Sequence, residues 1–396
     1  MNAKQAIIAG YTCLDIIPDL SSYPEGQFQH YFQPRRLLQA KGVTLTPGGV
    51  VSNTGLTLHR LGVPVRLIGK IGDDLFGRAV QNLIREEGAQ LADDLVIDPS
   101  QPTACTIIIN PPGYDRAFLH NPGANDTFYA SDLPREVLQG GDLFHFGYPT
   151  VMRSIYRGDG GELVSILQRA RRAGLTTALD FTLPDPISSA GKVDWREILA
   201  NALPYVDLFL PSLEELIFLL DRDTFDQMCT KINTPMIDAV TPNLLSALAE
   251  HVLDFGVKAV LVKFGHRGLY LRTASEERWK KGGRGLDGLD ERWHDREIWV
   301  PAFITEIRGT TGAGDAAVAG FIASILKEAD PGTALKMAAA VGACCVETGR
   351  VHSEIGTWEQ TKARFTSGWE SHPLDLSPYG WHQDQLRGFW EKDNAQ

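Results

Sequence analysis

The sequence predicts an α/β fold in which a doubly wound, mostly parallel central sheet carries helices on both faces and a small β lid. Short apolar runs typical of buried strands alternate with longer segments of helical periodicity, which is the pattern of parallel sheets. The 396 residues are 43% hydrophobic and 22% charged, so the chain can bury a large core. Residues 11–46 and 102–121 interrupt the alternation, and the second stretch contains β segments around a Pro-Pro-Gly turn. These two interruptions predict the lid.

The elements of the central sheet follow one another in a regular order. Apolar runs predict its strands at residues 6–10, 65–72, 142–147, 176–181, 206–211 and 258–265. Segments with apolar residues on one helical face predict helices at residues 52–61, 77–87, 161–173, 195–202, 213–220 and 243–255. Because helices separate the strands, the connections are crossovers and neighbouring strands are expected to run parallel.

The chain is predicted to form one α/β domain over residues 1–365, with the lid built from about 11–46 and 102–121. Residues 276–297 are charged and rich in glycine, which predicts a mobile surface insertion. Residues 366–396 are expected to form a separate C-terminal extension, because tryptophans occur there among Pro, His and Gly with weak periodicity.

Composition excludes several classes of partner. The formal net charge of −11 provides no basic field for nucleic acid or anionic lipid. The longest apolar run, Met337–Val346, is about half of a membrane span, and residues 1–10 lack the hydrophobic region and cleavage site of a signal peptide. The five cysteines show no metal-binding spacing and are expected to be reduced. Together these features predict a cytoplasmic protein without a nucleic-acid or membrane partner.

Residues 308–326, RGTTGAGDAAVAGFIASIL, carry the strongest chemical signal. Small residues at the start of an apolar helix let backbone amides approach an anion, and the helix N-terminus adds partial positive charge. Asp315 falls in the first turn, where it is either a structural first-turn acid or a proton acceptor beside a transferring phosphoryl group. The segment is no Walker A loop, because no Gly-Lys-Ser/Thr follows. It also lies too far from the N-terminus for a dinucleotide fingerprint, so a dehydrogenase is disfavoured.

Four motifs in order resemble the ribokinase-like (PfkB) carbohydrate kinases over roughly residues 5–360. The C-terminal signature of that family, close to D-T-T-G-A-G-D, stands here as Gly309–Asp315. A Gly-Gly pair, an Asn and a helix ending in Leu-Gly appear as Gly48, Gly49 and Asn53 through Leu61-Gly62. The other two motifs are the G-x-x-G-x-D-x-x-G pattern, which stands at Gly69–Gly77, and the tripeptide Gly123-Ala124-Asn125.

The resemblance implies a role for each matching residue around the acceptor. Asp315 resembles the catalytic base that takes the proton from a sugar hydroxyl. Gly312, Ala313 and Gly314 resemble the anion hole for the migrating phosphoryl group. Asp15, expected at the end of the first strand, resembles the acceptor of sugar hydrogen bonds, and Gly48, Gly49 and Asn53 resemble the second substrate contact. For Asp15 a solvated strand-end acid is the alternative, and Asn53 is also suited to cap a helix.

The resemblance also implies ATP and Mg²⁺ as cofactors, with two departures from the family pattern. The usual Asn-x-x-Glu reads Ser212-Leu213-Glu214-Glu215, so Glu215 is expected to support magnesium through water while Ser212 replaces the Asn. Gly309 replaces an Asp that helps to form a monovalent-cation site, so potassium activation is not expected. The remaining nucleotide contacts are assigned to Thr311, Gly265, Gly268 and Lys263, although for Lys263 a surface position is the favoured interpretation.

The sequence therefore predicts an ATP-dependent phosphotransferase that phosphorylates a hydroxyl of a small sugar or sugar-like polyol. The turn from Gly48 to Asn53 contains no Lys, which favours an unphosphorylated substrate. A nucleoside kinase of the same family is the alternative within the class. A sugar-binding regulator without turnover is the alternative outside it, supported by the departures at Ser212 and Gly309. Lid strands often mediate dimers in this family, so a homodimer is expected.

Overall fold

The computed structural model describes residues 3–114, 116–231, 235–349, 354–384 and 387–392. Parts of the predicted lid (115), of the predicted domain (1–2, 232–234, 350–353) and of the predicted extension (385–386, 393–396) therefore lie outside the described residues. Within the described part, no helix is both long enough and apolar enough to span a membrane.

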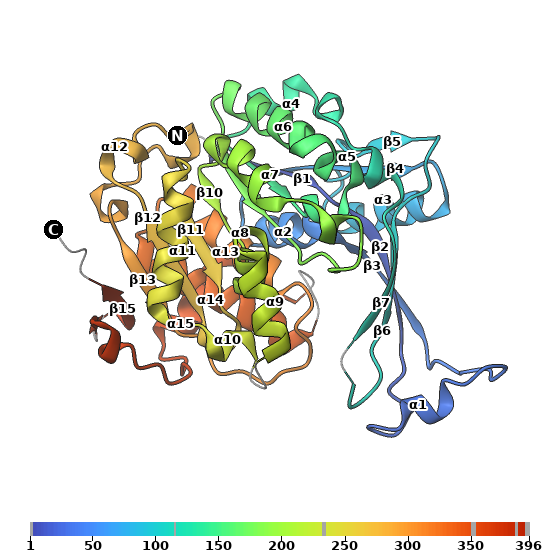
Figure 1. Ribbon diagram of the computed structural model, residues 1–396. Coiled ribbons are helices and arrows are strands. Elements are labelled where there is room, and N and C mark those ends of the chain that lie inside the picture. The colour runs from blue at the N-terminus through green and yellow to red at the C-terminus, as the bar shows by residue number, and fades with distance from the viewer. Residues whose placement is uncertain (1–2, 115, 232–234, 350–353, 385–386, 393–396) are drawn as a thin grey trace.

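The described residues form one large sheet in the order β14-β15-β13-β12-β11-β10-β9-β8-β1-β4-β5 (Figure 1). Its strands from β5 to β11 pair in parallel, and β12, β13, β15 and β14 extend it in antiparallel fashion. The prediction of a mostly parallel central sheet is confirmed. The bounds are β1 Ala6–Gly10, β4 Val65–Gly72, β5 Val96–Asp98, β8 Leu143–Gly147, β9 Thr176–Asp180, β10 Leu208–Phe209, β11 Ala259–Lys263, β12 Leu269–Thr273, β13 Glu297–Val300, β14 Trp381–Asp384 and β15 Phe389–Lys392.

Helices cover both faces of this sheet (Figure 1). One group packs together as α2 (Gly49–Arg60), α13 (Ala313–Leu326) and α14 (Pro331–Thr348). The other group contains α6 (Gly161–Arg172), α7 (Trp195–Ala202), α8 (Leu213–Leu220) and α11 (Pro242–Asp254). The remaining helices are α1 Phe28–Tyr31, α3 Leu75–Glu87, α4 Arg135–Gly140, α5 Arg153–Tyr156, α9 Arg222–Lys231, α10 Met236–Ala239, α12 Glu276–Trp279 and α15 Trp358–Thr366.

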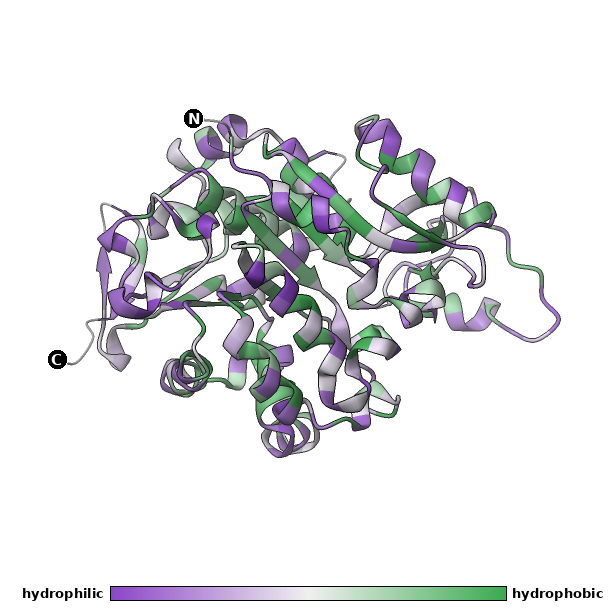
Figure 2. Cartoon of the chain, turned by 90° about the horizontal axis from the view of Figure 1, so that it is seen from above, coloured by the Kyte–Doolittle hydropathy of each residue, from purple (hydrophilic) through white to green (hydrophobic). Residues whose placement is uncertain are grey.

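Burial explains which helices lie at the centre. From Asp315 onward every residue of α13 is buried, because this helix is packed between α2 and α14. Such a helix is apolar on all sides, whereas α3 and α6 bury a single stripe. Figure 2 shows the same division, with hydrophobic strands in the interior and helices of mixed hydropathy around them.

A second, four-stranded sheet forms from the two segments that interrupt the alternation. Its order is β3 (Val43–Gly48), β2 (Cys13–Pro18), β6 (Cys105–Ile109) and β7 (Ala117–Asn121). The β2–β6 pair is parallel and the outer pairs are antiparallel. This sheet projects from the body of the molecule beside β1 and β4, with α1 near its tip (Figure 1). The apolar run of β6 thus belongs to the small sheet and not to the main one.

The segment 276–297 corrects a prediction. We expected a mobile surface insertion, but Trp279 and Trp293 are both buried and their rings stack with centroids 5.6 Å apart. The indole Nε1 of Trp293 donates to the carbonyl of Ala329 at 3.0 Å. The prediction was wrong because it rested on the charged residues of the segment. The two tryptophans among them bury enough apolar area to hold the segment against the rest of the protein.

The C-terminal stretch contributes two strands to the main sheet. Strand β15 pairs with β13, and β14 pairs with β15. Trp381 of β14 is buried against Tyr270 and Trp299, with ring centroids 6.1 and 6.0 Å away. Residues of 366–396 therefore cover one edge of the core.

Two residues of the sequence motifs have structural partners. Asn125 is fully buried, and its side-chain amide accepts from the Thr12 amide at 3.1 Å and donates to the Thr12 carbonyl at 2.9 Å. Asp74 caps α3 by accepting from the Gly77 amide at 2.8 Å, and it also accepts from the amide and hydroxyl of Thr103. These contacts fix the loops that join the small sheet to the main one.

Candidate active site

The carboxyl ends of four adjacent strands bring a set of polar side chains together. Tyr148 follows β8 directly, Asp180 is the last residue of β9, Ser212 follows β10, and Lys263 is the last residue of β11. The register places Gly147 beside Asp180, and Ser212 bridges to Lys263. In open parallel sheets this edge is the usual place for ligands, so the topology itself marks it as a candidate site.

Helix α13 begins at the same edge and carries Asp315 in its first turn. Gly312 caps the helix with φ of +74°, a left-handed conformation that glycine adopts without a steric cost. The small residues Ala313 and Gly314 then leave the first backbone amides of the helix close to the cavity described below. The N-terminal end of a buried helix attracts anions, which suits a phosphoryl group or the Asp315 carboxylate itself.

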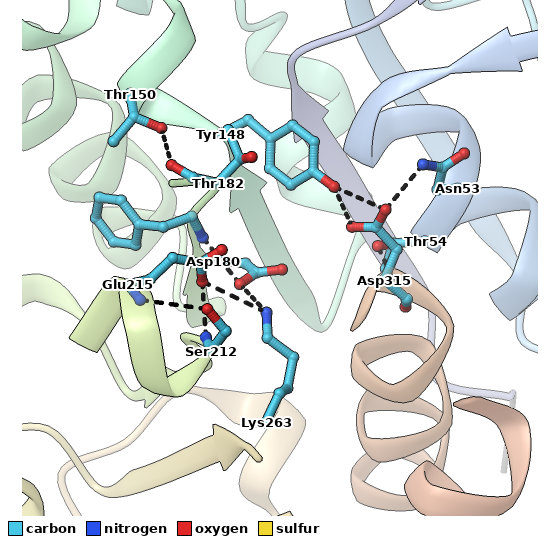
Figure 3. A network of polar contacts seen from close by, with 11 residues as sticks. Asn53, Thr54, Tyr148, Thr150, Asp180, Thr182, Ser212, Glu215, Lys263 and Asp315 are labelled. Carbon is cyan, nitrogen blue, oxygen red and sulfur yellow. Dashed lines mark hydrogen bonds and ion pairs between the residues drawn. The ribbon is translucent and has the colours of Figure 1, made fainter. Parts of the chain in front are cut away.

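The Asp315 carboxylate is buried and held by two neutral donors. The side-chain amide of Asn53 donates to Oδ2 at 2.8 Å. The hydroxyl of Tyr148 lies 2.8 Å from Oδ1 and 2.7 Å from Oδ2, so it donates to both oxygens in a shared bond. Figure 3 shows both side chains converging on this carboxylate, Asn53 from α2 and Tyr148 from the end of β8.

Burial changes the acidity of Asp315. Loss of water and the nearby charge of Asp180 raise the pKa of Asp315 from 3.8 to about 6, against the opposing hydrogen bonds of Asn53 and Tyr148 and the charge of Lys263. A carboxyl with this pKa is largely ionised at neutral pH and yet accepts a proton more readily than an exposed aspartate. That combination suits a general base.

A second cluster lies beside the first. Lys263 Nζ is 2.5 Å from Oδ1 of Asp180 and 3.9 Å from Oε2 of Glu215 (Figure 3). Burial alone would lower the pKa of Lys263, but the two carboxylates outweigh it and raise that pKa above its ordinary value. The surface position considered for Lys263 is therefore wrong, because its side chain is buried in an ion pair.

Ser212 and Glu215 form a capping box at the start of α8. The Ser212 amide donates to Oε2 of Glu215 at 2.7 Å, and the Glu215 amide donates to the Ser212 hydroxyl at 3.3 Å. Burial raises the pKa of Glu215 to about 7 despite the attraction of Lys263. The Ser212 side chain is thereby engaged with the helix, and the Glu215 carboxylate remains at the cavity wall.

These groups border a cavity of about 570 Å³. The expected nucleotide residues Ser212, Glu215, Lys263, Gly265 and Gly268 line it, as do the expected anion-hole residues. Thr311 does not line the cavity, whereas its neighbour Thr310 does. The wall also includes apolar and aromatic residues from elements after β12, among them Phe303, Ala339, Val346 and His372.

The expected acceptor contacts lie on the side of the small sheet. Asp15 belongs to β2 of that sheet, which corrects the prediction that it ends the first strand. Burial raises its pKa to about 6, and the Cys13 thiol donates to its Oδ1 at 3.2 Å. A Cβ atom on Gly48 would collide with the Asp15 carboxylate, and one on Gly49 (φ +81°) would lie 2.6 Å from the Tyr11 carbonyl. The pair of glycines thus allows β3 to pass close to Asp15 and Tyr11 on its way into α2.

Tyr148 and Asp180 are site residues that the sequence reasoning missed. Asp180 had a visible signal, since it is an acid at the end of the buried run TTALD. Burial of a carboxylate at that position costs free energy unless a polar or charged partner compensates it, and Lys263 is that partner here. Tyr148 had no comparable signal, because an aromatic residue after a strand is more often part of the core.

Comparisons with known proteins bear on the family. Residues 11–356 match the sequence profile described as pfkB family carbohydrate kinase. The chain belongs to this family. The kinase is 27% identical over 290 residues to an uncharacterized sugar kinase of Archaeoglobus fulgidus, a match that covers 73% of this chain and 94% of the relative. It is 23% identical over 352 residues to fructokinase-2 of rice (Oryza sativa subsp. japonica), covering 85% of this chain and 86% of the relative.

Solved structures agree with the fold. The Arabidopsis thaliana ribokinase complexed with ribose and ATP superposes on the kinase with a TM-score of 0.64 at 18% identity. The superposition covers 91% of this chain and 98% of the ribokinase. The ribokinase-like fold, with a large mostly parallel sheet and a small second sheet, is thus established for this carbohydrate kinase.

Proposed function

We propose that the protein transfers the γ-phosphoryl group of ATP to a hydroxyl of a small sugar or polyol, with D-fructose and D-ribose as the first acceptors to test. The fructokinase and ribokinase named above support this choice of acceptors, because they share the family or the fold. In the proposed reaction the acceptor oxygen attacks the γ-phosphorus as Asp315 accepts its proton. The bond to the β,γ-bridging oxygen breaks, and ADP leaves.

One observation carries the proposal: a buried carboxylate stands in the first turn of the helix whose N-terminal amides border the cavity. The donors that the described residues give to Asp315 Oδ1 and Oδ2 are neutral, so the carboxylate can still accept a proton. The amides of Gly312, Ala313 and Gly314 are the group we assign as anion hole. Holding acceptor and donor in line between these two groups would supply most of the rate enhancement.

ATP is proposed to occupy the cavity of about 570 Å³. The apolar wall that includes Phe303 and Val346 suits the base, and the turn from Gly265 to Gly268 borders the same space. Lys263 supplies a positive charge at the phosphate end, beside Gly314. Its pairing with Asp180 compensates that charge within the protein.

The acceptor is proposed to lie between Asp315 and the small sheet. Asp15 and Asn53 provide an ionised oxygen and an amide, which together suit neighbouring hydroxyls of a sugar. We propose that the small sheet, with its segments 11–46 and 102–121, is a lid that closes over the acceptor and excludes water.

The donor set at the site fits Mg²⁺. The described residues contain no group of three or more His, Cys, Asp and Glu side chains that could hold a metal alone. Magnesium usually keeps several waters and takes one or two carboxylates plus phosphates, and Glu215 lines the cavity. Among the described residues Oδ2 of Asp180 is buried without a hydrogen-bond partner, which suits a bound water or cation. When bound, Mg²⁺ would neutralise phosphate charge.

A single assay tests the function. ADP release from Mg-ATP is measured with D-fructose, D-ribose, a polyol or adenosine as acceptor, against a sample without acceptor. We expect one sugar or polyol to stimulate ADP release, and we expect the same compound with a non-hydrolysable ATP analogue to raise Tm. Absence of stimulation and of any Tm shift for every sugar and polyol would contradict the proposal.

A nucleoside kinase is the second candidate, and one observation favours it. The rings of Tyr11, His120 and Tyr148 pack beside the proposed acceptor site, with Tyr11 and Tyr148 stacked at 6.2 Å. Aromatic rings of this kind could stack on a nucleobase. Stimulation by adenosine alone would select this candidate. A Tm shift with a sugar but no ADP release would instead select a binding regulator.

We further propose a cytoplasmic homodimer that associates through the small sheet. Its last strand, β7, is exposed along its whole length, with Phe118 and Leu119 53% and 59% exposed. Exposed apolar side chains on an open sheet edge mark an interaction surface. The five cysteines are unpaired, as expected for a reducing compartment.

A further inference from the structure

Tyr148 has an unusual backbone and an unusual partner. It follows β8 with φ of +65° and ψ of +42°, the left-handed region that bulky side chains rarely adopt. Strain of this kind persists where the surrounding structure fixes it, and it is concentrated at functional sites. In this conformation the Tyr148 hydroxyl reaches both oxygens of Asp315, at 2.8 and 2.7 Å.

The hydrogen-bond arrangement fixes the orientation of the carboxylate. Oδ2 accepts from Asn53 as well as from Tyr148, whereas the only donor given to Oδ1 by the described residues is Tyr148. A carboxylate oxygen has room for two donors, so Oδ1 keeps a position for an acceptor hydroxyl. Burial raises the pKa of Tyr148 well above 10, so its hydroxyl stays protonated and acts as a donor.

Tyr148 also connects the base with the small sheet. Its ring stacks on that of Tyr11, with centroids 6.2 Å apart and planes at 28°. Tyr11 in turn lies against His120 of β7, and its hydroxyl is 3.3 Å from Nδ1 of that histidine. The side chain of Tyr148 is therefore braced on one face by residues that the small sheet positions.

We propose that Tyr148 is a positioning residue for phosphoryl transfer, because its hydroxyl orients the Asp315 carboxylate and stabilises the ionised form that accepts the proton. This inference rests on the proposed role of Asp315 as base. It adds a function for a residue that belongs to none of the four sequence motifs.

The charges around Asp315 determine the direction of the effect. Asp180 from β9 raises the pKa of Asp315, and Lys263 from β11 lowers it. Cys345 from α14 is a neutral thiol, because burial and Asp315 raise its pKa to about 12. Asn53 from α2 and Tyr148 donate hydrogen bonds that lower the pKa of Asp315. Removing the Tyr148 hydroxyl deletes one of these stabilising contacts, so Asp315 should then hold its proton to higher pH.

The variant Tyr148→Phe tests the proposal because it keeps the ring and removes the hydroxyl. In a titration of ¹³C-labelled aspartate carboxyls, with Asp315→Asn used to assign the signal, we expect Asp315 to titrate at higher pH in the variant. With Mg-ATP and D-fructose or D-ribose, whichever wild type phosphorylates, kcat/KM should fall about threefold to tenfold near pH 6 and recover toward wild type near pH 8.

Tyr270→Phe is the matched control. The Tyr270 hydroxyl donates to Oε1 of Glu297 at 3.0 Å; both side chains are buried, and neither lines the cavity that contains Asp315. This variant loses the same kind of tyrosine–carboxylate bond, so it reproduces the effect on stability. Its pH profile and its Asp315 titration should match those of wild type.

An unchanged Asp315 titration in Tyr148→Phe would overturn the proposal, as would a loss of activity that is equal at all pH values. If Tyr148→Phe fails to fold, 3-fluorotyrosine at position 148 provides the opposite test. Its hydroxyl is a stronger donor and should move the Asp315 titration to lower pH; no movement would overturn the proposal. If wild type phosphorylates no acceptor, the proposed function fails, and the carboxyl titration alone decides the role of Tyr148.

Discussion

At the scale of single residues, burial of the Asp315 carboxylate lowers the stability of the folded protein at neutral pH. Its pKa is raised from 3.8 to about 6 in the folded protein, chiefly by burial. The folded state therefore binds a proton more tightly than the unfolded chain does between about pH 4 and pH 6. Above this window the folded protein holds an ionised carboxylate at a cost of about 3 kcal/mol, and below it the cost disappears.

Asp315→Asn should therefore separate activity from stability. We expect kcat to fall by about 10²–10⁴-fold, because the proton acceptor is lost, with a much smaller change in acceptor affinity. The free energy of unfolding should rise by about 1–3 kcal/mol near pH 8, and the gain should vanish below about pH 4. Steady-state kinetics and urea unfolding across pH measure the two effects.

The exposed Asp73 provides a control for this prediction, since its side chain is 65% exposed and forms an ion pair with Arg78 at the surface. Asp73→Asn should change neither kcat nor the dependence of unfolding on pH by a measurable amount. Turnover of Asp315→Asn close to that of wild type, with any confirmed acceptor, would remove Asp315 from the mechanism.

At the scale of elements, two parts of the molecule differ in how firmly they are held. Helix α13 is buried on all sides, and a Cβ on its Gly320 would lie 2.9 Å from the Cα of Ala338, so α13 and α14 are packed backbone to backbone. The small sheet has no such support, because β7 is exposed throughout. The proposed base and anion hole thus lie on a rigid element, and the proposed acceptor contacts lie on a less buried one.

Hydrogen exchange should reveal this difference. We expect a bound sugar to slow amide exchange in residues 11–46 and 102–121, because closure of the small sheet protects its backbone. Nucleotide alone should protect mainly residues 258–320. Mass spectrometry of peptides from the free, sugar-bound and nucleotide-bound protein measures both. Exchange in the two segments that stays unchanged at saturating sugar would show that the small sheet is no lid.

At the scale of the whole molecule, the C-terminal stretch completes the core. Trp381 is 3% exposed and lies edge-on against Tyr270 and Trp299, each of which is fully buried. His372, from the same stretch, lines the cavity proposed for ATP. The described residues of this stretch therefore contribute both to the stability of the main sheet and to the wall of the cavity.

Trp381→Ala should accordingly destabilise the whole protein. Deletion of a buried indole leaves a cavity, so we expect the free energy of unfolding to fall by about 3–5 kcal/mol. Urea unfolding monitored by circular dichroism measures the loss. The exposed Tyr379, in the same stretch, gives a control: Tyr379→Ala should cost less than about 0.5 kcal/mol. A similarly small cost for Trp381→Ala would contradict a core role.

Assembly provides the second prediction at this scale. If the small sheet is the dimer interface, Leu119→Glu on β7 should shift the protein from dimer to monomer, because a charge would be buried between the subunits. Analytical ultracentrifugation measures the mass. Leu75 on α3 is 71% exposed outside this sheet, and Leu75→Glu should leave the mass unchanged. A wild-type monomer at all accessible concentrations would contradict the dimer.

The sequence alone determined the fold class, because strand and helix periodicities are local properties of the chain. It also determined the position of Asp315 behind three small residues, and the segments that build the second sheet, since both are continuous patterns. The two structural motif residues Asn125 and Asp74 were visible as well, although only their contacts show that they hold loops.

Only the tertiary structure decided which side chains meet. Asp180 lies 32 residues after Tyr148 and 83 residues before Lys263. The three residues come together because strands β8 to β11 end at one edge of the sheet. The burial of Lys263, the placement of Asp15 on β2 and the buried tryptophans of 276–297 were likewise beyond local patterns. The physical reason is common to all of them. Burial and charge pairing are set by neighbours distant in the chain, and periodicity carries no information about those neighbours.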